Sequence, residues 1–312
     1  MLMHYTSEED ILCSIDSFFE HSSRRKDDAD ILPYNSYVTS VDIVSENLDF
    51  RRHTFSPQNI GYKALAVNIS DCMAMGAIPH SFLMALSLPQ TIEKVYLESI
   101  LEGMSTLAQR YNISLIGGDI AFEDSLRFAI TIFGIPITEP IRRGNASVGD
   151  SIFYLPSSLL LSPLGLARVG FETLEEGVHG YPEAKKAQCE PTLVELDSLH
   201  ILAPFAQSLS LMDSSDGLFS DIPRLLGTHS SSLGAELVIS EDLLHHEVLT
   251  WCASRRCNPV EFALHGGEEY CLLGTAPPHI MSLLQDALPH IVVLGTVTQG
   301  NTISCNGNVV KK

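Results

Sequence analysis

Segments with helical hydrophobic spacing alternate with short apolar segments in the first half of the chain. Apolar residues recur every three or four positions over residues 61–79, which predicts a helix that Gly76 and Pro79 end. The same spacing predicts a helix over 92–110 and a short one over 8–21. Continuous apolar segments predict strands over residues 34–44, 81–89, 113–119 (ending at a glycine pair) and 126–137.

A polar segment rich in turn residues, 138–150, separates this half from the second. The chain has 312 residues, which favours two domains, and we expect them to span residues 1–138 and 139–312. The overall pattern predicts an α+β protein, because the strand-like segments are too uneven for a barrel of eight βα units. In the second half we expect helices over 195–210 and 220–227, and strands over 151–155, 235–239, 290–298 and the end of 266–275.

Charge and composition exclude several classes of function. The net charge is −19, which argues against general nucleic-acid binding and against anionic membranes, since both need clustered Lys and Arg. No apolar run of ~18 residues predicts a membrane span, and the first residues lack an apolar signal core. The seven cysteines are scattered without a C-x-x-C pair, which argues against structural zinc and a disulfide framework. We therefore expect a cytoplasmic protein with reduced cysteines.

Aspartates recur at the ends of apolar segments, whereas the common nucleotide and hydrolase motifs are absent. One such aspartate alone is usually a turn residue or a cap. Asp71 is more informative, because a carboxylate near the C-terminus of a helix opposes the helix dipole unless a cation is bound. Asn68, one turn earlier, shares its face. The aspartates that follow this pattern are Asp28, Asp42, Asp71, Asp119, Asp213 and Asp216.

Oxygen ligands suit hard cations such as Mg²⁺, which usually takes one or two carboxylates together with substrate phosphates. Six aspartates therefore indicate several ions, and several ions indicate a polyphosphate. In the segment Asp213–Gly217, DSSDG, two carboxylates would hold metal and a serine hydroxyl would lie near phosphate. The predicted helix behind it would direct its N-terminus at an anion. Asp221 is expected to be a residue of that helix's first turn rather than a ligand.

These segments resemble the thiamine-monophosphate kinase family, within the superfamily of aminoimidazole ribonucleotide synthetase and selenophosphate synthetase. The most specific match is YKALAVNISDCMAMGAIP, Tyr62–Pro79. The resemblance runs in order from about Asp10 to about Gly307. The other segments that carry it are KDDADIL, SVDIVSENLDF, LIGGD, DSSDGLFSDI and GGEEYCLL.

The resemblance implies an N-terminal α/β domain whose sheet forms a homodimer interface, followed by a second α/β domain. It implies transfer of the γ-phosphoryl of ATP to thiamine monophosphate with several Mg²⁺ ions, and no catalytic side chain. The implied metal ligands are Asp28, Ser40, Asp42, Asp71, Asp119, Asp213 and Asp216. Residues implied to contact ATP are Gly118, Asp119, Ser215 and one of Arg142 and Arg143. The substrate would meet Glu268 and the position of Asp49.

The chain departs from the family pattern mainly around the substrate. Asp49 stands where the family usually has a histidine, and Ile120, Ala121 and Phe122 replace two threonines and an arginine. We therefore expect the metal site to follow the family more closely than the acceptor pocket. Two alternatives stay open: another ATP-using enzyme of the superfamily, or a catalytically weakened nucleotide-binding homologue.

Overall fold

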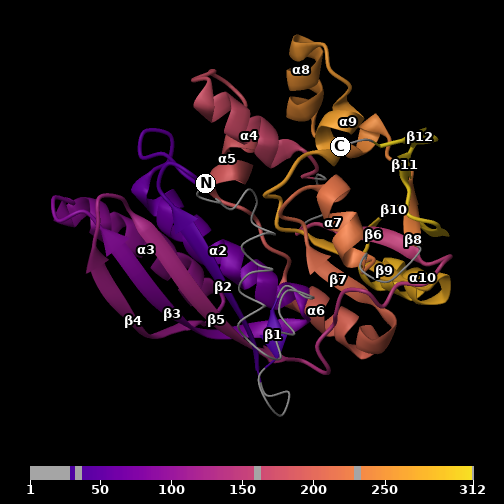
Figure 1. Ribbon diagram of the computed structural model, residues 1–312, viewed down its shortest axis with the longest axis horizontal. Coiled ribbons are helices and arrows are strands. Elements are labelled where there is room, and N and C mark those ends of the chain that lie inside the picture. The colour runs from indigo at the N-terminus through magenta and orange to yellow at the C-terminus, as the bar shows by residue number, and fades with distance from the viewer. Residues whose placement is uncertain (1–28, 32–36, 158–162, 228–232, 311–312) are drawn as a thin grey trace, which may run out of the picture.

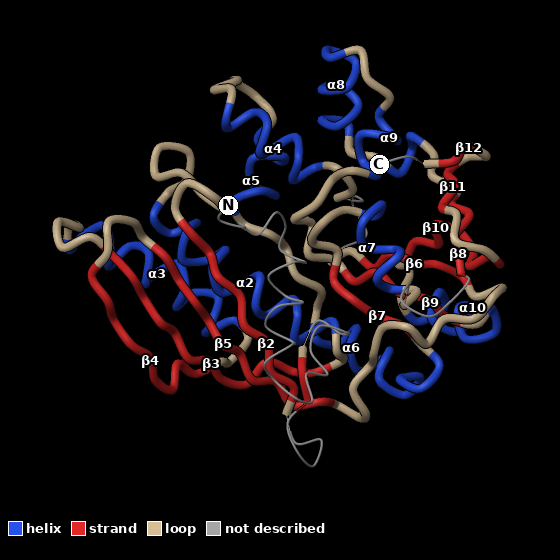
Figure 2. The backbone as a smooth tube through the Cα atoms, in the orientation of Figure 1, coloured by secondary structure: helices blue, strands red, loops and turns tan. Residues whose placement is uncertain are grey.

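The computed structural model describes residues 29–31, 37–157, 163–227 and 233–310. The helix expected over 8–21 and the predicted ligand Asp28 lie outside these residues. Within them the chain forms two sheets with helices packed against them, which confirms the mixed helix and strand fold (Figures 1 and 2). No helix in the described ranges is both long enough and apolar enough to cross a bilayer.

The first sheet has five strands in the order β1-β2-β5-β3-β4, with β3 and β4 parallel and the other pairs antiparallel. Two helices, α2 and α3, cover one of its faces (Figure 1). The elements are β1 Asp30–Ile31, β2 Val38–Ser45, α2 Pro57–Ala74, β3 Ala77–Leu88, α3 Lys94–Arg110, β4 Ser114–Phe122 and β5 Arg127–Pro136.

The second sheet has seven strands in the order β12-β11-β8-β10-β6-β9-β7. Its strands are β6 Ser151–Leu155, β7 Ser210–Asp213, β8 Leu233–Leu237, β9 Leu272–Ala276, β10 Val292–Gln299, β11 Ile303–Cys305 and β12 Asn308–Val309. The accompanying helices are α4 Leu166–Glu175, α5 Pro182–Cys189, α6 Leu196–Leu202, η2 Ala203–Ser208, α7 Leu218–Leu225, η3 Glu241–Leu243, α8 His246–Arg255, α9 Pro259–Leu264 and α10 Pro278–Ala287.

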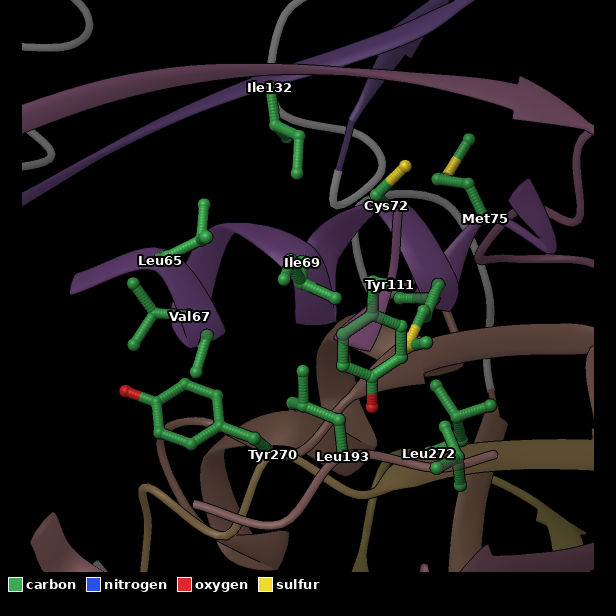
Figure 3. Packing of buried hydrophobic residues seen from close by; sticks show 14 of the residues in the cluster. Leu65, Val67, Ile69, Cys72, Met75, Tyr111, Ile132, Leu193, Tyr270 and Leu272 are labelled. Atoms are coloured by element: carbon green, nitrogen blue, oxygen red, sulfur yellow. The ribbon is translucent and has the colours of Figure 1, made fainter. Parts of the chain in front are cut away.

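Helix α2 is buried on all sides because it lies between the two halves of the molecule. Figure 3 shows Ile132 of β5 on one side of the helix and Leu193, Tyr270 and Leu272 on the other. An apolar surface around the whole circumference is typical of a helix buried in a core. Any polar side chain of α2 must therefore find a partner inside the protein.

The site-bearing strands differ from the sequence prediction in one respect. Strand β4 continues past the glycine pair and Asp119, where it was expected to end, so Asp119 lies within a strand, as Asp42 does in β2. Strand β4 passes through Gly117 and Gly118 without a break. Position 118 requires glycine, because β3 approaches too closely for a side chain. A Cβ added to Gly118 would lie 2.0 Å from the carbonyl oxygen of Met84.

Candidate active site

Three aspartates from different elements approach one another where β2, α2 and β7 converge. Asp42, Asp71 and Asp213, here called the carboxylate cluster, are tied together by side chains of β2 and α2. The Ser40 hydroxyl donates to Oδ2 of Asp71 at 2.5 Å, and the Ser70 hydroxyl donates to Oδ2 of Asp213 at 2.8 Å. The site therefore joins the first half of the chain to the second.

The position of these side chains follows from the helical repeat of α2. Asn68 and Asp71 are one turn apart and face β2, where Oδ1 of Asn68 accepts a hydrogen bond from the Asp42 backbone N–H at 3.2 Å. Ser70 points instead to β7. A single buried helix thus presents polar groups to both sheets at once.

Burial and mutual repulsion disfavour the charged forms of the cluster. Burial, followed by the charges of Asp213, Asp49 and Asp216, raises the pKa of Asp42 to about 6. Burial and the charges of Asp213 and Asp42 hold the pKa of Asp71 well above its ordinary value. The pKa of Asp213 is also raised, chiefly by burial. A cation bound among these carboxylates would remove that cost.

The two candidate arginines lie beside β7 and the carboxylate cluster. The charge of Arg143 lowers the pKa of Asp213 and so offsets part of the burial effect. Arg142 forms an isolated bridge with Ser210, and its carbonyl accepts from the Leu211 N–H at 3.3 Å. This places the Arg142 backbone beside β7, whereas the Arg143 charge is felt within the cluster.

The segment Asp213–Gly217, here called the DSSDG turn, packs against the segment Gly266–Tyr270, here called the Glu268 loop. The N–H of Glu268 donates to the carbonyl of Ser215 at 2.8 Å, and that of Tyr270 donates to the carbonyl of Ser214 at 2.9 Å. A Cβ on Gly217 would lie only 2.7 Å from the Gly266 carbonyl oxygen, so the close approach requires glycine. The Asp216 side chain is 53% exposed and pairs with Arg224 of α7.

Glu268 and Asp49 lie in the same part of the site, where the Glu268 charge acts on Asp49. Lys63 of α2 places its Nζ 2.9 Å from Oε1 of Glu268, and Gln188 of α5 donates to the other oxygen at 2.5 Å. Asp49 accepts from the Ser45 N–H at 2.7 Å. Burial raises the pKa of Asp49, and the Glu268 charge adds to this effect. The two predicted substrate positions are therefore near neighbours.

Asp119 and Gly118 lie apart from the carboxylate cluster in this chain. In the sheet register Asp119 pairs with Ala85, then Ala129, then Ile43, whereas Asp42 belongs to the next row. Because successive residues of a strand point to opposite faces, Asp119 faces away from α2. It also stands three strands from β2, which is roughly 14 Å at ~4.8 Å per strand. The structure does not bring this predicted ligand to the others.

The donor chemistry of the cluster suits a hard cation, although no compact metal cage is present. In the described ranges, no three Asp, Glu, His or Cys side chains lie close enough to hold one ion in common. Carboxylate and hydroxyl oxygens are the ligands of Mg²⁺, which needs only one or two carboxylates when waters and phosphate oxygens complete its shell. The residues present therefore fit ions shared with a bound phosphate.

The buried Glu269 supports the DSSDG turn and the Glu268 loop through a second set of hydrogen bonds. Glu269 accepts from the N–H groups of Gly165 at 2.8 Å and Gly267 at 3.3 Å, and from the Ser214 hydroxyl at 3.4 Å. Burial raises its pKa to about 7. It thereby links the start of α4 to both site loops. Asp221, predicted as a first-turn residue, is indeed in the first turn of α7 and is fully buried.

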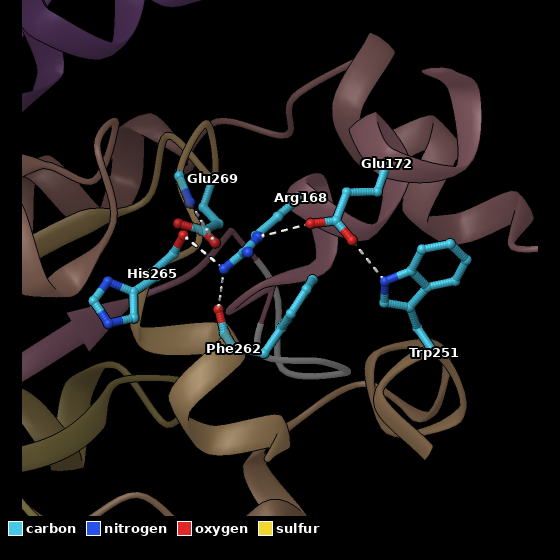
Figure 4. A network of polar contacts seen from close by, with 7 residues as sticks. Arg168, Glu172, Trp251, Phe262, His265 and Glu269 are labelled. Carbon is cyan, nitrogen blue, oxygen red and sulfur yellow. Dashed lines mark hydrogen bonds and ion pairs between the residues drawn. The ribbon is translucent and has the colours of Figure 1, made fainter. Parts of the chain in front are cut away.

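Arg168 of α4 fixes the end of α9, directly before the Glu268 loop (Figure 4). Its Nη1 donates to the carbonyls of Phe262 at 3.1 Å and His265 at 3.2 Å, and its guanidinium lies 4.1 Å from the Phe262 ring centroid. Glu172 accepts from both Arg168 and the Trp251 indole N–H. The sequence prediction included none of these supporting residues.

Lys63 and Gln188 are the residues nearest a predicted substrate position that the sequence prediction missed. For Lys63 a signal was present, because a single lysine stands in the apolar segment YKALAV and shares a helical face with Val67 and Ser70. For Gln188 no signal existed, since α5 is short and polar. A charged residue in a buried helix needs a partner, and that partner comes from the other half of the chain.

Known proteins resemble this chain in sequence and in fold. The family model "AIR synthase related protein, N-terminal domain" matches residues 26–136. The thiamine-monophosphate kinase of Synechococcus elongatus is 31% identical over 292 residues, covering 89% of this chain and 85% of the relative. The Aquifex aeolicus protein of that name is 29% identical, covering 88% and 85%.

A solved structure described as "AaThiL complexed with AMPPCP and TMP" has the same fold. It superposes with a TM-score of 0.84 at 27% identity and covers 100% of this chain and 97% of that one. The sequence relatives and the fold match along most of the chain, and the family model matches its first part, residues 26–136. This chain belongs to the thiamine-monophosphate kinase family.

Proposed function

We propose that this protein transfers the γ-phosphoryl group of ATP to thiamine monophosphate and forms thiamine diphosphate and ADP. The observation that carries the proposal is the carboxylate cluster, in which the buried Asp213 and the half-buried Asp42 and Asp71 have raised pKa values at the junction of the two sheets. The family and the solved relative with an ATP analogue and TMP bound supply the two substrates.

The chemistry needs positioning more than it needs a reactive side chain. The acceptor is a phosphate that is already deprotonated, so no general base has to remove a proton. The chain must hold two anions in line and balance their charge. Arg143 would lie against the phosphates of ATP, and the Ser215 hydroxyl and Gly118 would approach the nucleotide. Glu268 and Asp49 would face the acceptor.

Magnesium ions held by the site would neutralise the phosphate charges during transfer. Ser40 holds the Asp71 carboxylate and Asn68 holds the Asp42 backbone, so part of the site is ordered without an ion. Asp216 can join them once it leaves Arg224, since its side chain is exposed. We propose as ligands of ions at the carboxylate cluster Asp28, Ser40, Asp42, Asp71, Asp213 and Asp216, whereas the predicted ligand Asp119, on the other face of the sheet, would have to bind a separate ion.

The protein is proposed to be a cytoplasmic homodimer of two-domain subunits, with domains 1–138 and 139–312. The face of the first sheet that turns away from α2 exposes Val41 by 59% and Ile43 by 58%. An exposed apolar sheet face of this kind is typical of an interface. A second copy packed on it would also bury Asp119, whose metal role is tested by Asp119→Asn.

The direct test is to incubate the purified protein with ATP, Mg²⁺ and thiamine monophosphate and to separate the products by chromatography. Thiamine diphosphate and ADP in equal amounts would support the proposal. Binding of ATP without thiamine diphosphate would contradict it and would indicate another acceptor or a lost activity. Thiamine without its phosphate is the matched control acceptor, and it should give no product.

A further inference from the structure

A buried lysine and a glutamate meet across the junction between the two halves of the chain. Lys63 of α2 is 1% exposed, and its Nζ lies 2.9 Å from Oε1 of Glu268. The Nζ forms no hydrogen bond with the described residues, so the contact is an ion pair. The Phe55 ring, with its centroid 5.4 Å from the Nζ, covers the same ammonium group. A lysine in this setting depends on the carboxylate that pairs with it.

Glu268 is held at both carboxylate oxygens and at its backbone N–H. Gln188 donates to the second carboxylate oxygen at 2.5 Å, so both oxygens are held by buried side chains. The backbone has the left-handed φ of 59°, which is unusual for glutamate, and the N–H donates to the Ser215 carbonyl at 2.8 Å. The structure thus holds a strained residue in one orientation between α2, α5 and the DSSDG turn.

Among Lys63, Gln188 and Glu268, only Glu268 is exposed enough to meet a ligand. The Glu268 side chain is 32% exposed, whereas that of Lys63 is 2% exposed and Gln188 is buried. Glu268 also lines a cavity of about 170 Å³ between α4, α5 and the Glu268 loop. Leu166 and Ala167 give this cavity apolar walls. Glu183 and Glu269 add two carboxylates to that of Glu268, and Lys186 adds one ammonium group, so the lining is acidic on balance. Apolar walls with acidic groups suit a cationic ring.

We propose that Lys63 and Gln188 are positioning residues that hold the Glu268 carboxylate as a preset anionic contact for the cationic thiazolium ring of the acceptor. This inference rests on the proposed function, which supplies that acceptor. A carboxylate already held on both oxygens does not have to be ordered when the substrate binds. Lys63 reaches Glu268 from the helix that carries Asp71, so it also fixes the acceptor contact relative to the carboxylate cluster.

The test uses Lys63→Met and Gln188→Met, which remove the two contacts from opposite halves of the chain. Each should raise the KM for thiamine monophosphate by about tenfold and leave the KM for ATP within about twofold of wild type. Asn59→Ala is the matched control, because Asn59 also links α2 to the end of α5, through Glu190 at 2.7 Å, without touching Glu268. It should leave both constants unchanged.

The variant Glu268→Gln shows whether both residues act through Glu268. Adding Lys63→Met to Glu268→Gln should change the KM for thiamine monophosphate by less than about twofold, because the group that Lys63 positions has already lost its charge. If Lys63→Met does not fold, Gln188→Met carries the same comparison.

The outcomes separate this inference from the proposed function. A wild-type protein that forms no thiamine diphosphate would overturn the proposed function, and this inference with it. An active wild type with an unchanged KM in both single variants would overturn the inference alone. Equal losses for ATP and for thiamine monophosphate would also overturn it, since they would indicate a structural role.

Discussion

At the residue scale, the burial of some polar groups destabilises the folded state. Asp221 is fully buried, and its Oδ1 has no hydrogen-bond partner among the described residues. Burial, together with the charges of Asp213, Asp216 and Glu269, raises its pKa to about 8. It lies beneath the DSSDG turn, where the Ser214 hydroxyl approaches its Oδ2 at 3.4 Å.

We expect Asp221 to make stability fall as pH rises. An aspartate in the unfolded chain titrates near ~3.9, so between about pH 4 and pH 8 the folded state holds a proton that the unfolded state has lost. The free energy of unfolding should therefore decrease over this window and level off above it. Asp221→Asn should reduce the slope and stabilise the protein at pH 8 by on the order of 2–4 kcal/mol.

Urea unfolding at pH 5 and pH 8 measures this effect. Asp286→Asn, on the exposed face of α10, is the control and should leave the slope unchanged. An Asp221→Asn variant that is less stable than wild type at pH 8 would contradict the account.

At the scale of elements, the sequence predicted what depends on local spacing. Helices α2 and α3 follow from a sustained helical repeat, and β5 and β10 follow from apolar segments of strand length. Strand β4 was expected to end at its glycines, but it continues. The sequence could not show why Gly118 is a glycine, because the close approach of Met84 that requires it comes from another strand. Helices α4, α5, α8, α9 and α10 were not predicted, since short helices such as α5 depend on tertiary contacts.

The close packing of α2 on α3 gives a prediction at this scale. A Cβ added to Gly61 would lie 1.8 Å from the carbonyl oxygen of Ile100, and one added to Gly103 would lie 1.9 Å from that of Gln58. Alanine usually favours a helix by about 1 kcal/mol over glycine. Here Gly61→Ala should instead destabilise the protein by roughly 1–3 kcal/mol or more, because the helices must separate.

Thermal unfolding followed by circular dichroism would show the change. Glu102→Ala, at an exposed position of α3, is the control and should alter stability little. A Gly61→Ala protein as stable as wild type would show that the two helices do not pack as closely as described.

At the scale of the whole molecule, the candidate site depends on contacts between residues far apart in the chain. The aspartates of the carboxylate cluster were predicted from the sequence, and the structure brings Asp42, Asp71 and Asp213 together. The sequence did not predict their separation from Asp119, because the face to which a strand residue points depends on the register of the sheet. Nor could spacing predict Lys63 opposite Glu268.

The exposed face of the first sheet predicts the assembly. Ile43→Lys should convert a dimer into a monomer, because it places a charge on an exposed apolar face. Light scattering after gel filtration should show the mass halve. Val238→Lys, at an exposed apolar position beside the second sheet, should leave the mass unchanged. A wild-type protein with the mass of one chain would contradict the dimer.

The central claim is that the carboxylate cluster holds magnesium for phosphoryl transfer, and the rate of thiamine diphosphate formation tests it most directly. We would measure this rate against Mg²⁺ concentration for the wild type and for Asp71→Asn, with the thermal stability of both. The account predicts no turnover without a divalent ion and a rate at least ~10²-fold lower in Asp71→Asn. It also predicts that this variant stays folded and is more stable without metal, because the mutual repulsion is relieved. A near-normal rate in Asp71→Asn, or turnover in the presence of a chelator, would contradict it.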